Sequence, residues 1–173
     1  MTDLQYPIGR FQVPDHLTDD ERTSAIQAVA DLPRLVRAAV TGLDEAQLDT
    51  PYRPGGWTVR QVVHHLPDSH VNAYIRFKLA LTEAEPRIKP YLEERWAELP
   101  DSRGPVATSL GFLDGLHGRW ASLLAQLPAD DFNRTFYHPD LGVLHLSQVL
   151  AQYAWHSRHH VAHITQLRRR MSW

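Results

Sequence analysis

Four histidines lie within eight residues near the C-terminus of the chain: His156, His159, His160 and His163. They form two interleaved pairs with a spacing of four, His156/His160 and His159/His163. On an α-helix, residues four apart share a face, with Cβ atoms roughly 5–6 Å apart. Two imidazoles placed in this way can bind one metal ion, so the segment predicts part of a metal site.

A second group of histidines, His64 and His65 followed by His70, lies about ninety residues earlier. One imidazole from this group and a pair from the C-terminal segment would form a three-histidine site with open positions. Such a site is typical of a catalytic rather than a structural metal. The chain has no cysteine, so any metal must be held by His, Asp or Glu.

Spacing alone does not choose between the two interleaved pairs. On a helical wheel with 100° per residue, His156, His159 and His163 lie at the edge of the apolar arc, whereas His160 points further into it. Gln152 and Gln166 extend a polar groove beside His159 and His163. Angular position therefore favours His159/His163.

Each of these residues also has a simpler interpretation. A single histidine is more often a buried residue bonded to its neighbours than a ligand, and it is the combination of a helical pair with a second cluster that indicates a metal. Only one of the adjacent His64 and His65 can face a given groove. Asp68 could accept a hydrogen bond from a ligand imidazole, which is the usual supporting arrangement, or it could be a solvated aspartate.

The apolar periodicity predicts four long helices, at about 19–42, 58–83, 108–127 and 146–171, and a short one over 91–98. Thr58 followed by Gln61 predicts a capping box. Pro33 and Pro67 fall inside predicted helices, and each predicts a kink or a break. Alternating apolar strands are absent, so residues 129–145 are expected to be an irregular connection.

These elements predict an all-α protein: a single four-helix-bundle domain over residues 1–173, with an extended N-terminal arm at 1–17. The link between the second and third helices is about twenty residues long and could span roughly 65 Å. The second helix is only about 39 Å long. The link can therefore run back along the bundle as a crossover, so that these two helices lie parallel.

Composition excludes several partners. The net charge is −2, and the only basic run, residues 168–170, sits at a helix end where cations favour the helix dipole, so no nucleic acid is expected. The N-terminus lacks a signal-peptide pattern, and no apolar run approaches the ~20 residues that span a bilayer. We expect a soluble, cytoplasmic protein with no membrane partner.

On seven stretches the chain resembles the YfiT-type branch of the DinB-like superfamily, over nearly its whole length. The stretches are Tyr6–Gly9, Leu48–Arg53, Gly56–Leu66, Asn72–Lys78, Leu116–Trp120, Phe136–Asp140 and Trp155–Ile164. The resemblance implies a four-helix bundle that forms cytoplasmic homodimers. It also implies one divalent ion per subunit, zinc or nickel, held by His65, His159 and His163.

The resemblance leaves His64, His156 and His160 near the site without an assigned role. From the residues themselves we expect His64 and Asp68 to support the ligands, and His156 or His160 to act as the general base. Pro67 departs from the family pattern, because relatives usually carry alanine there. A kink at this position, two residues after His65, would alter the ligand geometry.

The function expected on these grounds is that of a divalent-metal-dependent enzyme, a metal-dependent hydrolase acting on a small molecule. Three neutral imidazoles leave the ion its charge and an open position, which activates a bound nucleophile. Some family members are linked to transfer of the thiol bacillithiol onto electrophiles, so a thiol S-transferase is the first alternative. A non-catalytic, metal-stabilised binding bundle is the second. The sequence does not identify the electrophile.

Overall fold

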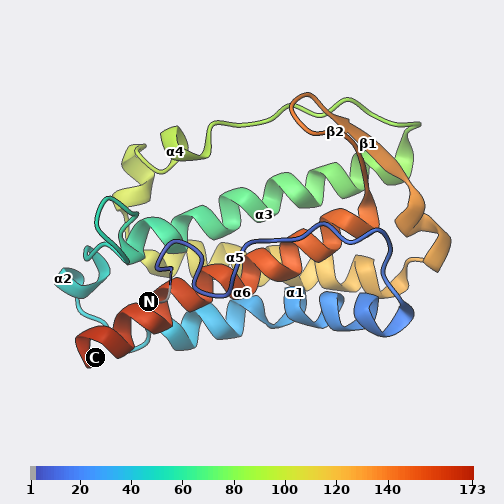
Figure 1. Ribbon diagram of the computed structural model, residues 1–173. Coiled ribbons are helices and arrows are strands. Elements are labelled where there is room, and N and C mark those ends of the chain that lie inside the picture. Colours follow the sequence, from blue (N-terminus) through green and yellow to red (C-terminus); the bar gives the residue numbers. More distant parts are fainter. Residues whose placement is uncertain (1–2) are drawn as a thin grey trace.

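The computed structural model describes residues 3–173 and shows four long helices packed side by side (Figure 1). Helices α3 and α5 run in one direction, and α1 and α6 run in the other. Both α1 and α3 pack against α5 and α6. The predicted four-helix bundle is confirmed, with the long helices at these bounds: α1 Asp19–Val40, α3 Val59–Thr82, α5 Val106–Gln126 and α6 Leu146–Met171.

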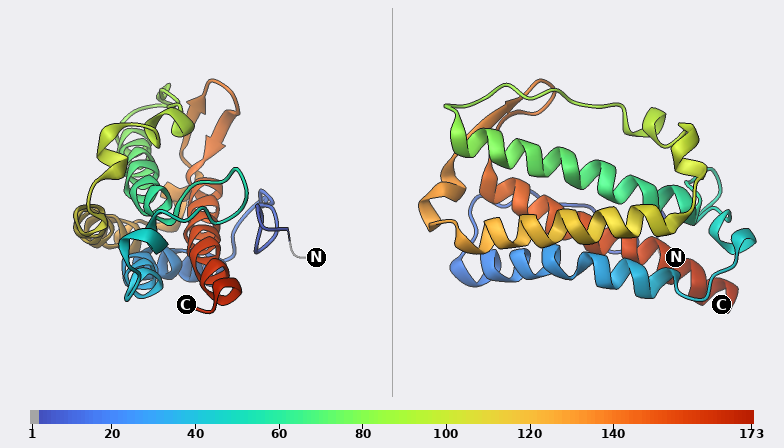
Figure 2. Two further views of the ribbon diagram at one scale, coloured as in Figure 1. Left: turned by 90° about the vertical axis from the view of Figure 1, so that its left-hand side faces the viewer. Right: turned by 180° about the vertical axis from the view of Figure 1, so that it is seen from behind.

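The link between α3 and α5 runs back along the bundle, as predicted, so these two consecutive helices are parallel (Figures 1 and 2). It carries α4 (Glu93–Trp96), which is shorter than the predicted helix over 91–98, and a 3₁₀ turn, η1 (Pro100–Arg103). Backbone hydrogen bonds join its first half to the strand that contains Tyr137, from Ile88 N–H to Tyr137 O and from Tyr137 N–H to Pro86 O. The link is therefore held against the bundle.

The predicted capping box at the start of α3 is present: the Thr58 side chain accepts from Gln61 N–H, and the Gln61 side chain accepts from Thr58 N–H. Neither internal proline breaks its helix: α1 continues through Pro33, and α3 continues through Pro67. Both prolines are buried. Packing across the bundle supplies most of the stability of such helices, so it outweighs the local loss of one backbone hydrogen bond.

The connection from α5 to α6 corrects one prediction. It contains a 3₁₀ turn, η2 (Ala129–Asn133), and a two-stranded antiparallel hairpin of β1 (Thr135–His138) and β2 (Gly142–His145). Four residues per strand are too few for an alternating pattern to stand out from an irregular segment. One further short helix, α2 (Glu45–Leu48), was also not predicted.

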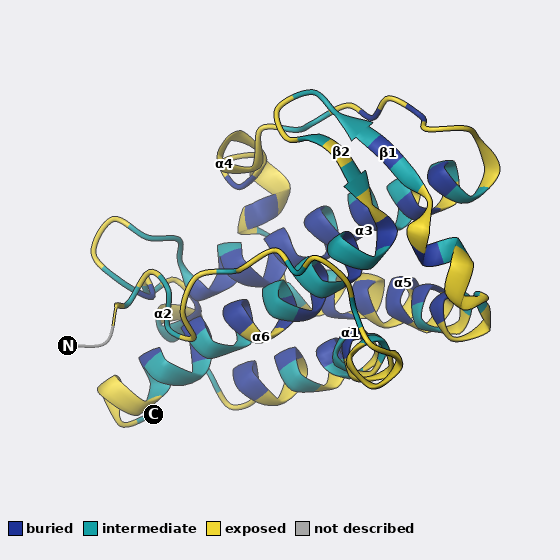
Figure 3. Cartoon of the chain, turned by 45° about the vertical axis from the view of Figure 1, so that its right-hand side comes forward, coloured by how far each residue is buried: buried dark blue, intermediate teal, exposed yellow. Residues whose placement is uncertain are grey.

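Buried residues line the inner faces of all four long helices (Figure 3). They form two apolar clusters, one around Phe77 and Trp120 and the other around Leu66 and Leu113. Residues 3–17 contain no helix or strand and lie along α6, where Trp155 Nε1 donates to Gly9 O. Among the described residues, no helix combines the length and the apolar character needed to cross a membrane.

Candidate metal centre

Three imidazoles converge between α3 and α6: His65 from α3, and His156 and His160 from α6. His156 Nε2 lies 3.2 Å from His65 Nε2 and 3.2 Å from His160 Nε2. One ligand atom from each of the three residues lies within 4.8 Å of those of the other two. The C-terminal helix and the earlier histidine cluster therefore meet, as the sequence predicted.

The spacing of these nitrogens fits a bound divalent ion. Metal–imidazole bonds of 2.0–2.1 Å at tetrahedral angles place two ligand nitrogens about 3.3 Å apart. Burial lowers the pKa of His65 to about 3 and lowers the pKa values of His156 and His160 well below the usual range. The three rings are thus neutral at neutral pH, which is the state in which imidazole binds a metal.

The converging set of described residues does not include His159 or His163. Both side chains are buried and line the same cavity, where the His159 ring stacks on Trp155 at 4.3 Å between centroids. The structure therefore brings His156 and His160, rather than the pair that the resemblance assigned, together with His65. His160 is buried, as its place in the apolar arc of the helical wheel predicted, and its ring faces His65 and His156.

His64 points away from the converging rings. Its Nδ1 lies 2.7 Å from Ser109 Oγ and its Nε2 lies 3.0 Å from Gly104 O. Asp68 lines a separate cavity of about 410 Å³ together with His64 and Asp101. Burial raises the pKa of Asp68 to about 6. The described hydrogen bonds of the three rings do not involve Asp68 or His64, so the supporting roles of these two residues stay a prediction.

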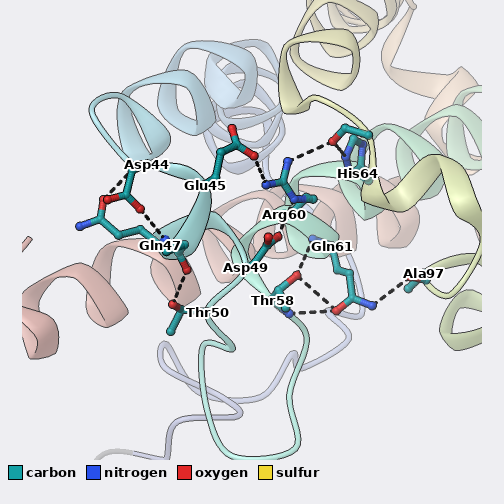
Figure 4. Close-up of polar contacts among 12 residues, drawn as sticks. Asp44, Glu45, Gln47, Asp49, Thr50, Thr58, Arg60, Gln61, His64 and Ala97 are labelled. Carbon is teal, nitrogen blue, oxygen red and sulfur yellow. Dashed lines mark hydrogen bonds and ion pairs between the residues drawn. The ribbon is translucent and has the colours of Figure 1, made fainter.

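The start of α3 is fixed by Arg60, whose side chain is buried (Figure 4). Its Nε donates to Asp49 Oδ1 at 2.6 Å, its Nη2 to Glu45 Oε2 at 2.5 Å, and its Nη1 to Gly104 O at 3.1 Å. These contacts tie the first turn of α3 to α2 and to the crossover link. They hold in place the helix segment that carries His65.

Two other histidines contact the outer nitrogens of the α6 rings. His156 Nδ1 lies 3.0 Å from His70 Nε2, and His160 Nδ1 lies 3.3 Å from His163 Nδ1. His163 Nε2 in turn lies 3.1 Å from Gln5 O in the N-terminal arm. The sequence singled out His70 only as part of a cluster, and nothing in it pointed to Gln5.

A cavity of about 370 Å³ opens onto the three rings. Its other walls include Tyr52, Arg53, Trp57, Glu93, Glu94 and Trp155. A second cavity, of about 230 Å³, shares Gln152, His156 and Glu93 with the first and adds Arg76, Tyr91 and His138. A small molecule therefore has space on two sides of His156. No sequence pattern pointed to Glu93 or Tyr91, and Arg76 lies in the matching stretch Asn72–Lys78 but was not singled out.

The family sequence model described as the DinB superfamily matches residues 28–164 of the chain. The chain belongs to this family. It is 57% identical to a Bacillus cereus protein named "Putative metal-dependent hydrolase", over 100% of both chains, and equally similar to a Bacillus anthracis protein of the same name.

Two solved structures are similar to the chain. YfiT from Bacillus subtilis, described as a probable metal-dependent hydrolase with an unusual four-helix bundle topology, superimposes with a TM-score of 0.95 at 50% identity over 98% of each chain. TT2238, described as a four-helix bundle protein, matches with a TM-score of 0.56 at 20% identity, over 81% of this chain and 94% of that one. The second likeness shows the fold alone.

Proposed function

We propose that this DinB-superfamily protein is a metal-dependent hydrolase that holds one divalent ion per subunit with His65, His156 and His160. The observation that carries the proposal is the convergence of three buried, neutral imidazoles, with the Nε2 atom of His156 3.2 Å from each of the other two. The names of its relatives, at 57% identity, support it. The ligand pair on α6 differs from the pair expected from the resemblance.

When bound, a divalent ion with three neutral ligands supplies Lewis-acid chemistry and lowers the pKa of a coordinated water or thiol. The remaining task of the protein is to hold a proton near the nucleophile. His156 and His160 were predicted to do so, but a ligand nitrogen has no free lone pair. Glu93 is better placed, because it lines both cavities beside His156. Burial, and to a smaller extent repulsion by Glu94, raises the pKa of Glu93. This makes Glu93 a stronger base than an exposed carboxylate.

Hydrolysis is tested by assaying the purified protein with simple ester and amide substrates, with and without chelator. We expect chelator-sensitive turnover and a loss of about 10²-fold or more in Glu93→Gln, the usual effect of removing a general base. Glu94→Gln is the matched control, because Glu94 is adjacent and lines only the larger cavity. Equal activity of both variants and the wild type would refute the role of Glu93.

Thiol S-transfer, with a low-molecular-weight thiol such as bacillithiol, is the second candidate. It is favoured by the finding that, within residues 3–173, no carboxylate hydrogen-bonds to the three converging rings. A metal alone can deprotonate a thiol, whereas water benefits from a base. Turnover that requires thiol and yields a thioether would replace hydrolysis. If metal binds and neither reaction occurs over a broad substrate panel, the non-catalytic binding bundle is supported.

The ion is proposed to be zinc or nickel, since imidazole donors suit both and, among the described residues, no hard oxygen donor joins the converging set. We also propose a homodimer, on family grounds alone. Sedimentation at micromolar concentration should give twice the chain mass of 19.8 kDa. A species of monomer mass at all concentrations would refute the dimer.

A further inference from the structure

We infer that two chains of neighbouring histidines, each ending on a backbone carbonyl, set the tautomers of His156 and His160 so that their Nε2 lone pairs face the metal. The inference deepens the proposed function, since it assumes that these two residues are ligands. It assigns positioning roles to His163, His70 and His117.

The first chain begins at the N-terminal arm. A carbonyl oxygen can only accept, so the 3.1 Å contact to Gln5 O places the His163 proton on Nε2. In a neutral ring, Nδ1 of His163 is then an acceptor. The 3.3 Å contact between the two Nδ1 atoms must therefore be donated by His160. With its proton on Nδ1, His160 presents a lone pair at Nε2, the atom directed at His156 Nε2.

The second chain begins at α1. His117 Nδ1 lies 2.6 Å from Val29 O, so His117 carries its proton on Nδ1 and has an acceptor at Nε2. Within the part of the chain that the structure describes, that Nε2 is buried without a partner, and so is Nδ1 of His70. The two rings are neighbours, with centroids 4.9 Å apart. Pairing of these two nitrogens needs a rotation of one ring, and it requires His70 to be the donor. The Trp120 indole N–H, which is also buried without a partner among the described residues and whose ring centroid lies 5.8 Å from both imidazoles, is the competing donor.

His70 then carries its proton on Nδ1, and its Nε2 is an acceptor. The 3.0 Å contact between His70 Nε2 and His156 Nδ1 is therefore donated by His156, which leaves a lone pair on His156 Nε2. The opposite direction would leave lone pairs on both His70 Nδ1 and His117 Nε2, and the single N–H of Trp120 could satisfy only one of them. Buried polar atoms without partners are costly, so this arrangement is disfavoured.

Both chains end on neutral acceptors rather than on carboxylates. A carboxylate partner makes a ligand histidine more basic and donates more charge to the metal. Histidine and carbonyl partners orient the ligands without this added charge. The expected result is an ion that remains strongly electrophilic, which suits activation of a nucleophile.

The experiment compares His117→Phe with His117→Gln in the full-length, metal-free protein. Glutamine can still donate to the Val29 carbonyl and accept from His70, whereas phenylalanine can do neither. Zinc affinity is measured by competition with a chromophoric chelator, and the tautomers are read from long-range ¹⁵N–¹H spectra. We expect His117→Phe to lower zinc affinity about 10–100-fold and to move the His156 proton toward Nε2. His117→Gln should remain close to the wild type in both.

Leu124→Ala is the packing control, because Leu124 is buried on the same helix and outside both chains. It should lower thermal stability without changing zinc affinity or tautomers. If His117→Phe does not fold, His163→Leu against His163→Gln tests the first chain in the same way. The inference would be overturned if the apolar variant, His117→Phe or His163→Leu, kept wild-type zinc affinity. The ligand histidine of that chain, His156 or His160 respectively, would then also keep its proton on Nδ1. Failure of the wild type to bind zinc or nickel would instead refute the proposed function, and the spectra of metal-free protein would still decide the tautomers.

Discussion

The metal-free protein should unfold at an unusually high pH when it is acidified, because its buried histidines are neutral in the folded state. Burial lowers the pKa of His65 to about 3 and the pKa values of His117, His159 and His163 to about 4. It also lowers those of His70 and His160 well below the usual range. All six side chains are buried.

The sign follows from proton binding. The unfolded chain takes up protons as pH falls through about 6.5, whereas the folded chain does so only at a much lower pH, so stability is complete above pH 6.5 and decreases below it. Between pH 7.5 and 5.5, each such histidine costs about 1.4 kcal/mol. Six together cost about 8 kcal/mol, which is comparable with the 5–15 kcal/mol stability of a whole domain.

The assay is urea unfolding with chelator present, at pH 7.5, 6.5 and 5.5, followed by circular dichroism. His117→Gln should reduce the pH-dependent loss by about 1.4 kcal/mol, the share of one buried histidine. His16→Gln is the control, because His16 is exposed, and it should leave the loss unchanged. A free energy of unfolding that falls by less than about 2 kcal/mol from pH 7.5 to 5.5 would refute the reasoning.

Three further predictions concern the framework that holds the site, each measured as the free energy of unfolding in urea. Arg60→Ala should cost about 2 kcal/mol, because it removes charge-assisted hydrogen bonds made by a buried guanidinium. The control Arg95→Ala should cost almost nothing, because Arg95 forms an exposed pair with an N···O distance of 4.0 Å. Equal effects of the two substitutions would contradict this prediction. Thr58→Ala should cost about 1 kcal/mol through loss of the α3 cap, and no change would show that the cap is dispensable. Phe77→Ala should cost about 3–5 kcal/mol, since its ring is fully buried against Trp120, and a cost below about 1 kcal/mol would mean that the core closes over the space.

The fold was largely predictable because long amphipathic helices carry a strong periodic pattern. The position of Thr58 and Gln61 fixed the start of α3, and the length of the crossover link predicted that α3 and α5 would be parallel. The hairpin at 135–145 was not predictable, since its two short strands are stabilised by pairing with each other and by the contact of Tyr137 with the crossover link.

The site was predictable only in part. Spacing identified both histidine groups, but His156/His160 and His159/His163 have the same spacing, and the choice depends on how α6 is rotated against α3. That rotation is set by packing across the bundle, which a helical wheel does not contain. Glu93 and Gln5 join the site from the link and the arm, where no periodic pattern marks a functional residue.

The most direct test of the central claim is the metal content of single alanine variants, purified in zinc or nickel and measured by elemental analysis. His65→Ala, His156→Ala and His160→Ala should each lose the ion, whereas His159→Ala should retain about one ion per chain. Full retention in His156→Ala together with loss in His159→Ala would contradict the ligand set proposed here and support the pair implied by the resemblance.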